Sequence, residues 1–114
     1  MFYVVYLFDV PESEEESFET DWHALTLDIY EKHQSLGSRL HKREEGGYFA
    51  YAHWPDRATW QKMWQSDHSE NPMQAVYMSL KSVARVVCQG TISDDLLQPL
   101  TYRSASQKSD SGKG

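Results

Sequence analysis

Residues 52–68 read AHWPDRATWQKMWQSDH and hold three of the four tryptophans of the chain. The aromatic run from Tyr48 to Trp54 is typical of a β-strand, and Pro55 ends it because proline has no backbone N–H to donate. Asp56 is a residue type that caps helices, so a helix is predicted to begin directly after it. This stretch therefore predicts a strand that passes at once into a helix, with aromatic side chains on both.

Two further strands are predicted on the N-terminal side of this stretch. Residues 2–10, FYVVYLFDV, are rich in β-branched and aromatic residues and end before Pro11, so they form a strand that is apolar on both faces. Residues 36–43 form another strand, which pairs with residues 48–54 as a hairpin through a turn at residues 44–47. Both faces of the resulting sheet need to be covered.

A long helix is predicted between the first two strands. Ser13 and Glu16 fit a capping box at its start, and the helix is expected to run to about Gln34. Its apolar residues recur at spacings of four, three and four, which is the period of one helix face: Phe18, Trp22, Leu25 and Ile29. Acidic residues crowd its first turns, where they form a solvated face.

One more helix and one more strand are predicted in the C-terminal part of the chain. A shorter helical stretch holds Met73, Val76 and Leu80, and residues 83–92 form the fourth strand. The order is then that of an α+β, ferredoxin-like split β-α-β β-α-β domain, an antiparallel four-stranded sheet with helices on one face. We expect this domain over residues 1–92 and a C-terminal extension over residues 93–114, disordered from about residue 104.

Composition excludes several classes of function. A net charge of −6 without basic clusters excludes nucleic acid and anionic membranes as partners. Cys88 is the single cysteine, which fits a reducing compartment, and the first apolar run lacks signal-peptide features and is too short to span a bilayer, so a cytoplasmic protein is predicted. No histidine or cysteine has a firm metal-binding spacing, and no metal or other cofactor is expected.

The face of the sheet away from the helices predicts an oligomer. The first and fourth strands, FYVVYLF and VARVVC, carry apolar residues on both faces. The open face therefore needs a second cover, and a second copy of the chain can supply it by packing sheet against sheet. We expect a homodimer.

The chain resembles the antibiotic biosynthesis monooxygenase-like family of dimeric α+β barrels over about residues 3–90. The likeness rests on the order of elements, on LGSRL at residues 36–40, and above all on AHWPDRATW, similar to the family pattern of a strand ending in Trp, a cap and an early helical aromatic. Members include cofactor-independent oxygenases, haem-degrading enzymes and many proteins without an established activity. The resemblance implies a pocket between sheet and helices in each subunit.

The resemblance also implies positions within that pocket. Trp54 and Trp60 match positions of the oxygenase site, and His41 falls near a histidine position of some members. Ala50 stands where some oxygenases place an asparagine, which removes a hydrogen-bond donor. Met73 stands at or near the position of the histidine that binds haem iron, so haem degradation is not expected.

Oxygenation without a cofactor sets the chemical requirements of such a site. The substrate must become an electron-rich anion, so the protein supplies an aromatic slot, a base and a donor for the developing oxyanion. Histidine suits the role of a base, with His41 as our first choice and His23 as our second. The candidate catalytic residues are His41, Trp54 and Trp60, and the candidate ligand-binding residues are Tyr6, Trp22, His23 and Ala50.

Strand alternation predicts room for a ligand beside Trp54. Tyr48, Ala50, Ala52 and Trp54 share one face of their strand, and the two alanines leave space that either Trp22 or a ligand fills. Met63 and Trp64 are expected to be core, and His33 and His68 to be solvated.

Two functions follow from these residues. The first is cofactor-independent oxygenation of a small aromatic or quinol-type compound. The second is a noncatalytic dimer that binds a small apolar ligand or serves as an assembly module. The fold alone does not distinguish them.

Overall fold

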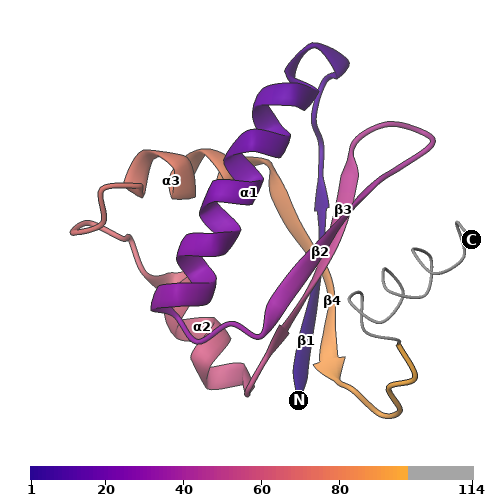
Figure 1. Cartoon of the computed structure of the whole chain (residues 1–114), viewed down its shortest axis with the longest axis vertical. Coiled ribbons are helices and arrows are strands. Elements are labelled where there is room, and N and C mark those ends of the chain that lie inside the picture. Colours follow the sequence, from indigo (N-terminus) through magenta and orange to yellow (C-terminus); the bar gives the residue numbers. More distant parts are fainter. Residues whose placement is uncertain (98–114) are drawn as a thin grey trace, which may run out of the picture.

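The computed structural model describes residues 1–97 as a four-stranded antiparallel sheet with three α-helices on one face (Figure 1). The strands follow the order β2-β3-β1-β4 across the sheet, and their bounds are β1 Phe2–Phe8, β2 Gly37–Lys42, β3 Tyr48–Trp54 and β4 Ala84–Thr91. The helices are the 3-10 turn η1 Glu12–Glu14, α1 Glu15–Lys32, α2 Arg57–Gln65 and α3 Gln74–Val83. The predicted α+β, ferredoxin-like order is confirmed.

The core lies between the sheet and the helices. Every second residue of β1 and of β3 is buried there, namely Phe2, Val4, Tyr6 and Phe8 on β1 and Tyr48, Ala50, Ala52 and Trp54 on β3. The antiparallel register sets Val4 opposite Ala52 and Tyr6 opposite Ala50. In the middle of the two strands a small alanine of β3 thus lies beside a larger side chain of β1, whereas at the ends Phe2 pairs with Trp54 and Phe8 with Tyr48. The predicted sharing of one face by the four β3 residues is confirmed.

The start of α1 differs from the prediction. Pro11, with its fixed φ of −63°, leads into η1, and α1 begins only at Glu15 after that turn. The residue before α1, Glu14, makes no side-chain cap, so the expected capping box of Ser13 and Glu16 is wrong. The apolar spacing is nevertheless confirmed, since Phe18 and Leu25 are buried.

The start of α2 is as predicted. The Asp56 side chain accepts a hydrogen bond from the Thr59 backbone N–H at 2.8 Å, which caps the helix. Trp60 and Met63 then lie buried on the face that packs on the sheet. β3 therefore passes into α2 over Pro55 and Asp56 alone.

Within residues 1–97, all helices lie on one face of the sheet and none lies on the other face (Figure 1). Its side chains on the two central strands are half-buried: Tyr3, Val5 and Leu7 on β1, and Phe49, Tyr51 and His53 on β3. β4 has no buried residue and begins at Ala84, since Val83 ends α3. Its pairing with β1 runs from Phe2 opposite Thr91 to Phe8 opposite Ala84, and it shifts beside Val5, where Val87 is left over and 45% exposed.

Residues 92–97 form no helix or strand, and the predicted disorder from residue 104 lies outside the described residues. None of the described helices combines the length and the apolar character that crossing a membrane requires.

The hairpin turn between β2 and β3 brings its backbone against the end of β1. Gly46 and Gly47 both have positive φ, +106° and +74°. A Cβ atom on Gly46 would meet nothing within 4 Å, whereas one on Gly47 would lie 2.7 Å from the carbonyl oxygen of Phe8. Gly47 is therefore required for its conformation and for its lack of a side chain.

We expect Gly47→Ala to destabilise the fold by more than Gly46→Ala. A left-handed conformation costs a residue with a Cβ about 1–2 kcal/mol, and at Gly47 the clash with the Phe8 carbonyl adds to this cost. Each kcal/mol corresponds to a fall of roughly 4–8 °C in melting temperature for a domain of this size. Calorimetry of both variants tests the ranking, and equal melting temperatures would contradict it.

Candidate functional site

A cavity of about 80 Å³ lies between the sheet and the three helices. Its wall comes from all four strands, all three helices and the loops that precede β2 and α3, and it includes Tyr6, Trp22, Ala52, Trp54, Trp64 and His68. A cavity of about 150 Å³ holds one benzene ring, so a ring enters this one when a wall side chain moves. Trp22 is half-buried, which leaves it free to shift.

Trp54 supplies an unused hydrogen-bond donor in this wall. Its side chain is 1% exposed, and the buried Nε1 has no hydrogen-bond partner within residues 1–97. Leaving a buried polar group unpaired costs about 1–3 kcal/mol. Trp54 thus combines a place in the cavity wall with an N–H that has no acceptor among the described residues.

Tyr6 supplies a second donor, and Trp60 holds it in place. Trp60 Nε1 donates to Tyr6 Oη at 2.8 Å, so the Tyr6 hydroxyl keeps its own proton to donate. Burial raises the pKa of Tyr6 to about 12, against the opposing effect of the Trp60 hydrogen bond, and the phenol stays protonated at neutral pH. Trp60 itself is buried and is not among the residues of the cavity wall, although it was a candidate catalytic residue.

Trp64 was expected to be core, and this expectation is wrong. Its side chain is half-buried and forms part of the cavity wall, 5.5 Å from the Tyr6 ring between centroids. Lys81 Nζ lies 5.1 Å from its ring centroid and donates to its carbonyl oxygen at 2.6 Å. Met63 is buried as expected and also reaches the wall.

The structure places His41 on the opposite face of the sheet. It pairs with Phe49 in the β2–β3 register, and the two rings stack at 4.4 Å and 6°. Strand residues alternate between the two faces of a sheet. The β2 residue that faces the helices is therefore the neighbour of His41, Leu40, which pairs with the buried Ala50. His41 therefore lies outside the cavity.

Of the four predicted ligand-binding residues, two line the cavity and two do not. Tyr6 and Trp22 line the cavity, whereas His23 is exposed on α1. Ala50 is buried but lies outside the wall, and its neighbour on the same face, Ala52, lines it. The structure brings together Tyr6, Trp22 and Trp54 and leaves out His41, His23, Ala50 and Trp60.

His68 is a wall residue that sequence reasoning missed. It was expected to be solvated, but it is 7% exposed, and its ring stacks on that of Tyr77 with 3.6 Å between centroids. It lies in the loop between α2 and α3 with a φ of +53°. A loop has no periodic pattern that predicts which side chains are buried. The one signal in the sequence was a histidine three residues after the end of the aromatic-rich helix.

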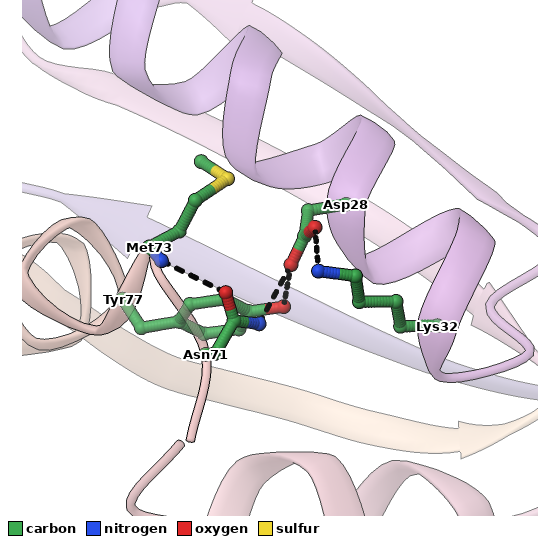
Figure 2. Close-up of polar contacts among 5 residues, drawn as sticks. All are labelled: Asp28, Lys32, Asn71, Met73 and Tyr77. Carbon is green, nitrogen blue, oxygen red and sulfur yellow. Dashed lines mark hydrogen bonds and ion pairs between the residues drawn. The ribbon is translucent and has the colours of Figure 1, made fainter. Parts of the chain in front are cut away.

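A buried carboxylate holds this loop against α1 and α3 (Figure 2). Asp28 of α1 is 9% exposed, and its Oδ2 accepts hydrogen bonds from Tyr77 Oη at 2.8 Å and from Asn71 Nδ2 at 3.0 Å. Its Oδ1 lies 2.9 Å from Lys32 Nζ, and Asn71 Oδ1 accepts from the Met73 backbone N–H at 2.8 Å. One carboxylate thus fixes both the loop and the ring on which His68 stacks.

These contacts determine the charge of Asp28. Burial alone would raise its pKa, but the hydrogen bonds from Lys32, Asn71 and Tyr77 outweigh it, and the pKa of Asp28 is lowered. The same arrangement raises the pKa of Tyr77, through burial first and its bond to Asp28 second. At neutral pH the pair is a carboxylate and a phenol.

The described part of the chain holds no group of three or more side chains placed to bind a metal ion. The arrangement is instead an aromatic cavity whose wall includes the indole of Trp54, the phenol of Tyr6 and the imidazole of His68.

Solved structures share this fold. A Deinococcus radiodurans protein assigned to the antibiotic biosynthesis monooxygenases matches with a TM-score of 0.63 at 7% identity, covering 87% of this chain and 99% of that one. SnoaB, a cofactor-independent oxygenase from Streptomyces nogalater, matches with a TM-score of 0.60 at 14% identity, covering 85% and 96%. The haem-degrader MhuD from Mycobacterium tuberculosis matches with a TM-score of 0.59 at 16% identity, covering 84% and 99%.

These matches establish that the chain has the fold of the antibiotic biosynthesis monooxygenases, as the sequence resemblance implied. At such low identity they establish the fold alone. No protein-family model and no curated protein matches the sequence.

We expect Asp28→Asn to destabilise the protein by about 1–3 kcal/mol at pH 7, because it weakens the acceptor for two buried donors. A lowered carboxyl pKa contributes stability above the unfolded value, and this contribution is lost as pH falls through the folded value. The difference from the wild type should therefore shrink below about pH 4.

Urea denaturation of Asp28→Asn across pH measures this difference. Lys32→Gln is the matched control, since Lys32 is half-exposed and an exposed ion pair contributes under about 1 kcal/mol. A difference between Asp28→Asn and wild type that stayed constant from pH 7 to pH 3 would contradict the assignment.

Proposed function

We propose that the chain binds a small quinol-type aromatic in the cavity and oxidises it with dioxygen without a cofactor. The observation that carries the proposal is the buried, unpartnered Nε1 of Trp54 in an aromatic cavity. A quinol offers a flat ring to the aromatic wall and an oxygen to this N–H. The fold shared with SnoaB, a cofactor-independent oxygenase, supports the same reaction.

The proposed reaction balances without a redox group on the protein. A quinol loses a hydroxyl proton, and the resulting anion donates electrons from its ring carbon to dioxygen, forming a C–O bond and a peroxide. The C–H bond of that carbon and the O–O bond then break, the carbon becomes a carbonyl, and the departing oxygen leaves as water with this hydrogen and the proton that the hydroxyl had lost. One quinol and one dioxygen give one hydroxyquinone and one water.

Trp54 and Tyr6 have a defined task in this reaction. Both are donors in the cavity wall, and each keeps a proton to give. A preorganised donor stabilises the negative charge that develops on the quinol oxygen, and losing one such donor commonly costs 10²–10³-fold in rate. These two groups would take the role of the asparagine that some oxygenases carry at the position of Ala50.

A noncatalytic ligand-binding module is the second candidate. The small cavity volume of about 80 Å³ favours it, because so little space leaves no room for a quinol and dioxygen together unless a wall side chain moves. Binding of a quinol in the absence of dioxygen, combined with no oxygen uptake in its presence, would support this candidate over the oxygenase.

We also propose that two copies pack through their open sheet faces. Tyr3, Val5, Leu7, Phe49 and Tyr51 form a half-buried apolar and aromatic surface on the two central strands. His41 Nε2 on this face is buried without a hydrogen-bond partner within residues 1–97, so a second chain can supply one. A second copy of the chain would cover the apolar surface and could also place a hydrogen-bond acceptor or donor beside His41.

We expect Trp54→Phe to reduce quinol binding and turnover by tenfold or more. The substitution keeps an aromatic ring but removes the free N–H, and it should cost about 1–2 kcal/mol in stability. Oxygen uptake is followed with hydroquinone, 1,4-dihydroxynaphthalene and anthrone, which carry one, two and three fused rings, after subtraction of the spontaneous rate. Anaerobic binding is measured by tryptophan fluorescence.

The matched control for this measurement is Phe18→Leu. Phe18 is buried between Phe8 and Tyr48 and does not line the cavity, so its loss lowers stability without touching the site. Equal losses of binding in Trp54→Phe and Phe18→Leu would show that only stability was affected. Absence of binding by the wild type to all three compounds would refute the proposed function.

We expect Val5→Asp to halve the mass of the protein in sedimentation equilibrium. The new carboxylate lies in the centre of the open face, where a second copy would bury it unpaired. Glu31→Gln, an exposed change on α1, is the control and should leave the dimer intact. A wild-type mass near 13.3 kDa at micromolar concentration would refute the dimer.

A further inference from the structure

We propose that His68 takes the hydroxyl proton from the quinol in the cavity and returns it to the departing oxygen. This inference rests on the proposed function and adds the base that the reaction requires. It transfers the role predicted for His41 to a residue in the loop between α2 and α3.

Comparing the ionisable groups in the wall leads to His68. They are Tyr6, His68, Tyr77 and Lys81. Burial raises the pKa of Tyr6 and of Tyr77, so both remain phenols. The Tyr77 hydroxyl also donates a hydrogen bond to Asp28. Lys81 donates to the Trp64 carbonyl, and an ammonium group has no lone pair to accept a proton. Imidazole is the group in this wall that can accept one near neutral pH.

His68 also has a route for proton exchange with solvent. A second, outer hollow of about 390 Å³ is lined by Lys32, His33 and residues 66–72. Among the described residues, His68 is the one that lines both this hollow and the inner cavity. A base in this position can take a proton on the inner side and exchange it with water on the outer side.

The loop holds His68 in place through its backbone. The His68 N–H donates to Ser66 Oγ at 3.0 Å, and its carbonyl oxygen accepts from the Asn71 N–H at 2.9 Å. Its φ of +53° is uncommon for a side chain with a Cβ, and such conformations concentrate at functional sites. Asn71 is anchored to Asp28 in turn. These bonds fix the backbone at His68, while the ring itself stacks on Tyr77.

The surroundings keep the imidazole neutral at pH 7. Burial lowers the pKa of His68, and His33 at the end of α1 and Lys81 on α3 lower it further. The Met63 backbone carbonyl on α2, whose effect exceeds that of Lys81, and the Asp67 carboxylate oppose this shift without cancelling it. Tyr77, stacked beneath the ring, is an uncharged phenol. The neutral ring is the form that accepts a proton.

The test compares His68→Asn and His68→Gln with wild type, using 1,4-dihydroxynaphthalene. Asparagine tolerates positive φ and glutamine preserves more volume, so at least one variant should fold, as checked by circular dichroism. We expect either variant to bind the quinol anaerobically within threefold of wild type and to lose at least 10²-fold in oxygen uptake. His23→Gln, an exposed histidine outside the cavity, should behave as wild type.

The pH profile provides a readout that a purely structural role would not change. Wild-type uptake should fall as pH drops below about 6.5, where His68 begins to take up a proton. His33→Gln should move this fall to higher pH, because it removes a group that lowers the pKa of His68. The folded His68 variants should lose this limb altogether.

The outcomes separate the two proposals. Folded His68 variants that keep wild-type uptake and its acid limb would overturn the role of His68 and leave the proposed function standing. A wild type that neither binds nor oxidises the quinol would overturn the proposed function and the role of His68 with it.

Discussion

The helical layer depends on the carboxylate of Asp28, which accepts hydrogen bonds from two segments that are far from it in sequence. Through Tyr77 it joins α1 to α3, and through Asn71 it joins α1 to the loop before α3. A buried carboxylate tolerates desolvation only when its oxygens are paired, so these segments can pack in one arrangement only. The same hydrogen bonds fix part of the cavity wall, because Tyr77 and the loop residue His68 both line the cavity.

The fold followed from the sequence where local chemistry and periodicity agree. Pro55 and Asp56 separate β3 from α2, and alternation along β3 placed Ala52 and Trp54 on the buried face. The start of α1 did not follow, because Ser13 and Glu16 satisfy the pattern of a capping box while Pro11 imposes a different turn ahead of them. A motif predicts a cap only when the backbone before it is free to adopt the capped conformation.

The site was predictable on the strands and less so elsewhere. The face taken by Trp54 follows from strand alternation. His41 was assigned without fixing the register of β2, and one residue of register decides which face a side chain takes. Trp60 and Trp64 share a helix, and which of them borders empty space depends on volumes that no pattern encodes. His68 depends on a loop whose conformation is set by Ser66 and by Asn71 with its distant partner Asp28.

The place of β1 in the sheet bears on how the chain is made. β1 is the first strand to be synthesised, yet it lies between β3 and β4, and Phe2 pairs with Trp54 on one side and with Thr91 on the other. At a synthesis rate of about 5–20 residues per second, one edge of this apolar strand waits roughly 5–20 seconds for β4 to be made. During that interval the nascent chain exposes an unpaired strand edge, which is a template for pairing with other chains until β4 covers it.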